Sequence, residues 1–260
     1  MSGDDESRER TEEPAAEGTP LVVPPPPPEV LTAIDALGIG LDEGDEHRLR
    51  EFLRLLLEAN RRMNLTAIRD PAEAWRRHIL DGLSLVGPLA SVKSVASGPI
   101  RVADLGSGGG VPGLVLACVM PAIEFTLIES TGKKARFLEQ AASSLNLTNV
   151  LVSAERAETV GRDAIHRERF DAVIARAVGP LRVLIELALP LLRVGGVLLA
   201  VKGGRAAEEV EASRKALHAL HGLVTSTLPT ETGTIVVVEK TRPTPGKYPR
   251  SPGTPSSRPI

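Results

Sequence analysis

The stretch Val102–Gly113 reads Val-Ala-Asp-Leu-Gly-Ser-Gly-Gly-Gly-Val-Pro-Gly, and these residue types suit a ligand-binding turn between a strand and a helix. The apolar run from Ile100 to Leu105 predicts a buried strand. The glycines that follow allow the main chain to approach a ligand and to adopt angles closed to other residues. Pro112 stands where a helix would begin. This order is typical of the nucleotide-binding opening of a doubly wound α/β fold.

The spacing of the glycines separates two kinds of ligand. A dinucleotide fingerprint needs G-x-G-x-x-G directly after the strand, but counting from Gly106 its third glycine would fall on Val111. A later triplet fits this spacing, but it starts two residues too far along: Gly108, Gly110 and Gly113. Asp104 would repel a pyrophosphate and would suit a cationic ligand. The pattern therefore favours S-adenosylmethionine and is similar to the first motif of class I methyltransferases, with a structural turn in another α/β protein as the alternative.

Composition excludes several other classes of protein. The chain has 260 residues, 42% of them hydrophobic, and no run approaches the roughly 18 apolar residues of a membrane span. The charged first twenty residues lack the apolar core of a secretory signal, so we expect a cytoplasmic location. The single cysteine, Cys118, excludes an internal disulfide and a cysteine cluster for metal. We expect a monomer that uses no metal and contacts no membrane.

Composition also divides the chain into four segments. Residues 1–29 are acidic and include the run Pro24–Pro28, which predicts a disordered segment with a stiff spacer. Residues 30–98 have helical periodicity, and residues 241–260 form a basic, proline-rich tail. Beyond residue 29 the chain carries 29 basic and 25 acidic residues, a mildly basic balance that is compatible with nucleic acid.

Residues 99–240 alternate strands with helices, which predicts a parallel sheet covered on both faces. The last two strands have no helix between them and predict a terminal hairpin with one antiparallel strand. The expected strands are residues 100–105, 124–129, 150–153, 170–175, 195–202, 223–228 and 234–239. The fold class is therefore α/β, with the Rossmann-like, seven-stranded and mostly parallel sheet of class I S-adenosylmethionine-dependent methyltransferases, preceded by an N-terminal helical extension.

Charged residues after the second strand suggest further contacts. Glu129 ends that strand, at a position where an acid commonly holds both ribose hydroxyls of a nucleotide. Three cations then crowd the first turn of the next helix, where the helix dipole prefers anions: Lys133, Lys134 and Arg136. Either water screens these charges or they bind phosphates.

Two other places carry polar residues of open role. His78 and Asp81 are three residues apart and can meet on one helical face. They form either a structural hydrogen bond or a substrate contact. In the tail, Lys247 and Arg250 flank Tyr248, the only tyrosine. With so few aromatic residues, stacking on bases is not expected, and phosphate contacts would dominate.

Several motifs occur together and in order, over residues 30–260, and they resemble the bacterial small-subunit ribosomal RNA guanine-N7 methyltransferases (RsmG, formerly glucose-inhibited division protein B). The motifs are residues 64–71, 77–81, 104–113, 132–134, 156–158, 175–177 and 247–255. Compared with the family, Gly82 replaces a usual serine, Val111 replaces a bulkier residue and Gly109 replaces alanine or proline. These differences remove no charged group. The N-terminal segment lies outside the family pattern.

This resemblance implies S-adenosylmethionine as the cofactor and 16S ribosomal RNA or the small subunit as the partner. It places Gly106 and Val111 on the methionine and ribose side of the cofactor, and Ala157 and Glu158 at the adenine. Arg176, at the end of the fourth strand, would lie beside the cofactor and the target base. Together with Asp104, Gly108 and Glu129, these residues are the expected cofactor site. The expected RNA contacts are Lys133, Lys134, Arg136, Lys247, Arg250 and His78.

The residues also bear on the reaction. Cys118 is misplaced for attack on a cytosine, and residues 175–178 lack the Asn/Asp-Pro-Pro-aromatic motif of amine methylation. A substrate atom that is already nucleophilic, such as guanine N7, needs only alignment. We therefore expect Arg176 to position the reactants and no general base to act. The alternatives are a small-molecule methyltransferase, a dinucleotide-dependent dehydrogenase or a cofactor-binding module.

Overall fold

A seven-stranded sheet with the order β3-β2-β1-β4-β5-β7-β6 forms the centre of the computed structural model, which describes residues 21–93 and 98–260. Neighbouring strands are parallel except that β7 is antiparallel to both β5 and β6. The strands are β1 (Arg101–Leu105), β2 (Glu124–Ile128), β3 (Val150–Ser153), β4 (Phe170–Arg176), β5 (Leu192–Lys202), β6 (Gly222–Pro229) and β7 (Thr234–Lys240). The predicted fold class and the terminal hairpin are confirmed.

The register of the central strands determines where a ligand can meet the sheet. Leu105 at the end of β1 is paired with Ile128 of β2 and with Ala175 of β4. The residues that follow these three strands therefore emerge side by side at one edge. Ligands of open parallel sheets bind at this carboxyl edge.

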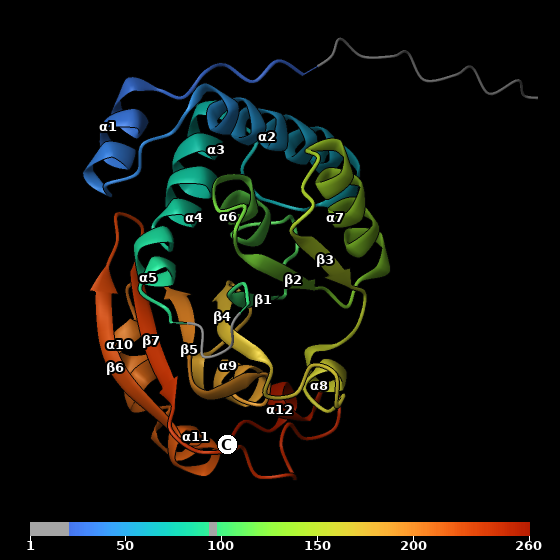
Figure 1. The fold of residues 1–260 in the computed structure, drawn as a ribbon, viewed down its shortest axis with the longest axis vertical. Helices are drawn as coiled ribbons and strands as arrows, with labels where there is room; N and C mark the ends of the chain where they lie inside the picture. Colours follow the sequence, from blue (N-terminus) through green and yellow to red (C-terminus); the bar gives the residue numbers. More distant parts are fainter. Residues whose placement is uncertain (1–20, 94–97) are drawn as a thin grey trace, which may run out of the picture.

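One helical layer is built from the N-terminal half of the chain and the first two crossover helices (Figure 1). It contains α1 (Pro28–Ala36), α2 (Glu43–Met63), α3 (Pro71–Ala74), the π-helical turn η1 (Trp75–Leu80), α4 (Asp81–Leu83), α5 (Val86–Ala90), α6 (Gly113–Val119) and α7 (Gly132–Ser144). The other layer contains α8 (Ala157–Val160), α9 (Leu181–Ala188), α10 (Ala206–Glu211), α11 (Arg214–Leu220) and α12 (Thr254–Ser257). In the described ranges, no helix is both long and apolar enough to cross a membrane.

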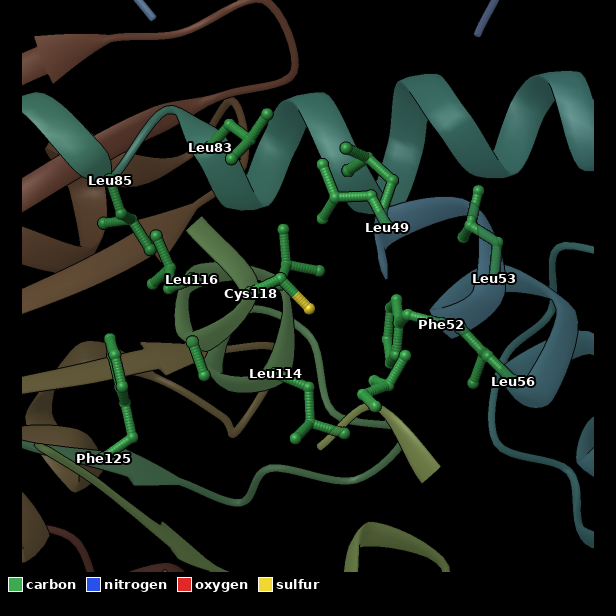
Figure 2. Close-up of a cluster of buried hydrophobic side chains, with 14 of the residues drawn as sticks. Leu49, Phe52, Leu53, Leu56, Leu83, Leu85, Leu114, Leu116, Cys118 and Phe125 are labelled. Carbon is green, nitrogen blue, oxygen red and sulfur yellow. The ribbon is translucent and has the colours of Figure 1, made fainter. Parts of the chain in front are cut away.

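Helix α2 anchors the first layer. Asp42 and Asp45 form a capping box at its start, which satisfies main-chain N–H groups that have no partner within the helix. Its apolar stripe is buried, as the helical spacing of its leucines predicts. Figure 2 shows these side chains gathered with residues of α6: Leu49, Phe52, Leu53, Leu56, Leu114, Leu116 and Cys118. The helical extension is thus part of the same core as the sheet.

The N-terminal boundary predicted at residue 29 is wrong for the residues that the structure describes. Val23 is buried, and the indole N–H of Trp75 donates to the carbonyl oxygen of Pro24 at 3.0 Å. Helix α1 already begins at Pro28. A proline run has no internal hydrogen bonds, so its carbonyls are free to accept one from a neighbour. Residues 1–20 of the predicted disordered segment lie outside the described residues.

The basic tail is also packed against the domain rather than separate from it. Tyr248 is buried, and the Arg167 guanidinium donates to the carbonyl oxygens of Tyr248 and Thr244 at 2.8 and 3.0 Å. Arg162 donates to the Pro249 carbonyl oxygen at 2.8 Å. The boundary predicted at residue 241 is therefore a change of composition, not of packing.

The packing of residues 21–27 leads to a first prediction. A protein lacking residues 1–27 loses the buried Val23 side chain and the acceptor of the Trp75 indole. Its free energy of unfolding should be about 2–4 kcal/mol lower than that of a protein lacking only residues 1–20. Urea denaturation of the two truncated proteins measures this difference. Equal unfolding midpoints would mean that the segment contributes nothing to stability.

Candidate active site

The turn after β1 presents main chain rather than side chains. Gly106, Gly108 and Gly110 have φ values of +67°, +54° and +88°, which L side chains rarely adopt. The N–H groups of Gly106 and Ser107 donate to the Ile128 carbonyl oxygen at 2.9 and 3.2 Å, which ties the turn to β2. A Cβ added to Gly106 would lie 2.9 Å from a methyl group of Val178. A side chain at residue 106 would therefore collide with Val178, so this turn depends on glycine.

Asp104 lies beneath this turn and is 1% exposed. Its Oδ2 accepts a hydrogen bond from the Gly113 N–H at 3.2 Å. Burial is the main cause that raises the pKa of this carboxyl to about 7. In the part of the chain that the structure describes, its Oδ1 is buried and has no hydrogen-bond partner. Asp104 thus shapes the turn and keeps one acceptor oxygen unused.

Glu129, just beyond β2, holds the turn from the other side. Its two carboxylate oxygens accept from the N–H groups of Gly108, at 3.0 Å, and Thr131, at 2.7 Å. The side chain is largely buried, yet it borders a cleft at the carboxyl edge. A carboxylate has about four lone-pair positions, so two N–H donors leave capacity for hydroxyl donors of a ligand.

The cleft has a volume of about 300 Å³ and gathers residues from six separate parts of the chain. Gly106, Glu129, Ala157 and Glu158 border it, as do Val178 and Ser256. Four of the predicted cofactor residues are thus brought together. The other four lie outside its lining: Asp104, Gly108, Val111 and Arg176. Val111 is half-buried and packs against the first helical layer.

Ser256 and Gly253 are site residues that the sequence analysis missed. Ser256 borders the cleft, and the Gly253 N–H donates to Oε1 of the buried Glu158 at 2.8 Å. The tail motif was visible in the sequence, but no spacing rule relates residue 253 to residue 158, which is 95 positions earlier. Only the folded chain brings the two together.

Arg176 ends β4 and links the sheet to the helical extension. Its Nε lies 2.5 Å from Oδ2 of Asp81, and its Nη2 donates to the Arg77 carbonyl oxygen at 2.8 Å. The hydroxyl of Thr232, in the turn before β7, donates to the other oxygen of Asp81. The Asp81 side chain is 3% exposed and that of Arg176 20%. The guanidinium is thus fixed in place at the carboxyl edge.

His78 does not lie where RNA could contact it, so that prediction is wrong. The ring is buried, and its Nε2 is 2.9 Å from the Thr66 hydroxyl. Burial, followed by the nearby Arg176 charge, lowers the His78 pKa to about 4. The predicted pair with Asp81 is not formed either, since each residue has another partner. His78 is a neutral structural residue.

The remaining predicted RNA contacts fall into two groups. Lys133 and Arg136 are exposed and Lys134 is half-buried at the start of α7. Lys247 is also exposed, with its Nζ 5.2 Å from the Tyr248 ring centroid. Arg250 differs from these cations, because its guanidinium is 29% exposed and is engaged by Glu186 in a bidentate pair of 2.8 and 2.6 Å.

A glycine turn after the first strand, in a sheet of the order 3-2-1-4-5-7-6, defines the class I S-adenosylmethionine-dependent methyltransferase fold. A protein of Corynebacterium glutamicum of known crystal structure has a similar fold, with a TM-score of 0.52 and 18% identity over 82% of this chain and 96% of that one. The sequence profile of the family described as rRNA small subunit methyltransferase G matches residues 45–235.

Two relatives carry the name ribosomal RNA small subunit methyltransferase G. The protein from Chloroflexus aggregans is 44% identical over 86% of this chain and 94% of its own length. The protein from Sorangium cellulosum is 43% identical over 93% of this chain and 98% of its own length. The chain therefore belongs to the rRNA small subunit methyltransferase G family.

Asp104 leads to a prediction about pH. Because its folded pKa is raised from 3.8 to about 7, the folded protein retains a proton that the unfolded chain releases, so this carboxyl destabilises the fold as pH rises from about 4 to 7. Asp104→Asn keeps an acceptor for Gly113 and removes this cost. Between pH 5 and pH 8, the free energy of unfolding of the Asp104→Asn protein should rise by about 2 kcal/mol relative to that of wild type.

Urea denaturation at several pH values tests this expectation. Asp70→Asn is the matched control, because Asp70 is exposed and asparagine can still cap α3. If the Asp104→Asn and wild-type profiles ran parallel from pH 5 to pH 8, the carboxyl would not be titrating in that range.

Proposed function

We propose that this protein transfers a methyl group from S-adenosylmethionine to N7 of a guanine at one site in 16S ribosomal RNA. The observation that carries the proposal is the bare-backbone turn at Gly106, which opens on a cleft bordered by Glu129 and Glu158. Membership of the family, whose relatives bear the name of a small-subunit RNA methyltransferase, supports the substrate. The protein acts as a monomer in the cytoplasm.

The residues present fit this cofactor. Gly106 presents bare main chain at the cleft, because a Cβ at this position would collide with Val178. Asp104 keeps a buried oxygen without a partner, which suits the cationic end of S-adenosylmethionine. Glu129 and Glu158 border the cleft, where carboxylates would repel the pyrophosphate of a dinucleotide. When bound, S-adenosylmethionine supplies a methyl group made electrophilic by its positively charged sulfur.

The chemistry at the end of β4 suits a target atom without a proton to lose. Residues 175–178 are Ala-Arg-Ala-Val and contain no carboxylate or amide. The guanidinium of Arg176 has N–H donors and no acceptor atom, and the Asp81 carboxylate is occupied by Arg176 and Thr232. Guanine N7 has a free lone pair, so orientation is sufficient. Arg176 is the proposed positioning residue, because Asp81 and the Arg77 carbonyl hold its guanidinium still.

The experiment that tests this function uses labelled S-adenosylmethionine with unmethylated 16S RNA and with unmethylated small subunits. Nucleoside analysis by mass spectrometry should find the label only in N7-methylguanosine, at about one per RNA molecule. Arg176→Ala should lower turnover at least about 100-fold in a folded protein. Label in another nucleoside, or in small molecules of a cell extract instead of RNA, would refute the proposal.

The cations at the start of α7 are the proposed RNA phosphate contacts, together with Lys247. They follow Glu129 and lie on the cofactor side of the sheet, where the target base must arrive. The Lys133→Ala/Lys134→Ala protein should bind 16S RNA more weakly. Its slope of log affinity against log salt should fall by about 0.7–0.9 for each lost contact. Its affinity for S-adenosylmethionine should not change.

RNA affinity at several salt concentrations measures this effect. Lys215→Ala is the control, because Lys215 is an exposed cation on α11, in the other helical layer. If the double variant and the control gave the same slope, the α7 lysines would be a solvated helix face without an RNA contact.

A further inference from the structure

Residues 244–257, near the end of the chain, form a segment that we call the strap. It runs along the α9 layer to the cofactor cleft. In Figure 1 this red segment, which includes α12, lies beside α8 and α9. It begins at Thr244, whose N–H donates to Glu168 at 2.9 Å, and it ends in the short helix α12. Within the tail, the strap reaches the cleft at Ser256, which is part of the cleft's lining.

The strap is attached firmly just before it reaches the cleft. Arg250 makes a bidentate ion pair with Glu186 of α9, and its own N–H donates to the same carboxylate at 2.9 Å. The Glu186 side chain is 1% exposed. Arg162 and Arg167 donate to strap carbonyl oxygens. A segment that is held by a buried carboxylate and by two further arginine side chains keeps a defined position, which a wall of a binding site requires.

The strap meets the cleft through two residues. The Gly253 N–H donates to Oε1 of Glu158 at 2.8 Å, while the other oxygen, Oε2, accepts no hydrogen bond in the described part of the chain. Gly253 has a φ of +81°, so the turn that aims this N–H depends on glycine. Ser256 is exposed and borders the cleft, whereas its neighbour Ser257 is exposed outside the cleft lining.

We propose that the strap is the outer wall of the cofactor cleft and that Gly253 is a positioning residue for Glu158. The main-chain N–H of Gly253 binds one carboxylate oxygen and thereby orients the carboxylate so that Oε2 faces the exocyclic amine of the adenine. This inference rests on the proposed function, because it takes the ligand to be S-adenosylmethionine or its product. A tail that only stabilised the domain would leave ligand recognition unchanged when Gly253 or Ser256 is altered.

The first test compares Ser256→Trp with Ser257→Trp. Both residues are exposed on α12, so both variants should melt at the wild-type temperature. Titration calorimetry with S-adenosylhomocysteine should give a Kd at least about tenfold higher for Ser256→Trp, because the indole fills the cleft. The Ser257→Trp protein should bind within about twofold of wild type. Equal affinities in the two variants would overturn the assignment of the strap as a wall.

The second test examines the positioning of Glu158 through ligand discrimination. Wild type should prefer S-adenosylhomocysteine over S-inosylhomocysteine, which lacks the amine, by about tenfold or more. Gly253→Ala should reduce this preference toward that of Glu158→Ala. Gly246→Ala is the control, because Gly246 lies on the same tail, has no positive φ and has open space for a Cβ.

The outcomes distinguish a failure of the positioning role of Gly253 from a failure of the proposed function. A preference for adenine that is unchanged in Gly253→Ala would overturn the positioning role of Gly253. If wild type bound neither S-adenosylhomocysteine nor S-adenosylmethionine, the proposed function itself would fail. Both proposals would be supported if wild type binds S-adenosylhomocysteine and if the preference for adenine is lost in Gly253→Ala but kept in Gly246→Ala.

Discussion

The architecture depends on two buried carboxylates that hold a turn made of glycines. Asp104 accepts from the N–H of Gly113, and Glu129 accepts from that of Gly108. A glycine-rich turn has few side chains of its own to stabilise it and loses more conformational entropy on folding than other sequences. The two acids supply the missing hydrogen bonds from beneath and from beside the turn. The bare backbone can therefore face a ligand without collapsing onto the sheet.

These carboxylates also set the electrostatic character of the site. Burying an acid costs free energy, and for Asp104 this cost appears as a pKa raised to about 7. Such strongly shifted groups concentrate at functional sites, where stability is given up for chemistry. A site lined by acids accepts a cationic ligand more readily than a phosphate. Asp104 and Glu129 thus both stabilise the turn, and Glu129 also gives the cleft a negative charge that disfavours a pyrophosphate.

The sequence was sufficient where function depends on local pattern. The glycine spacing placed the turn, and the strand and helix periods predicted the sheet with its antiparallel end, because each of these features is a property of consecutive residues. It was insufficient for the surroundings of His78 and Arg250. Their residue types suggested RNA contact, but their hydrogen-bond partners are Thr66 and Glu186, which lie 12 and 64 positions away. Pairing over such distances depends on packing, which no local period encodes.

Composition set both proline-rich ends of the chain apart from the folded domain, and both predictions were wrong for the same physical reason. Few apolar residues and many prolines predict disorder because such segments bury little surface. Yet a proline-rich segment leaves its carbonyl oxygens free and pre-sets its own backbone angles, so fixing it costs less entropy. Here Trp75 donates to Pro24, and Arg162 donates to Pro249. Donors elsewhere in the fold therefore order both ends, and the C-terminal end thereby comes within reach of the cleft that Glu129 and Glu158 border.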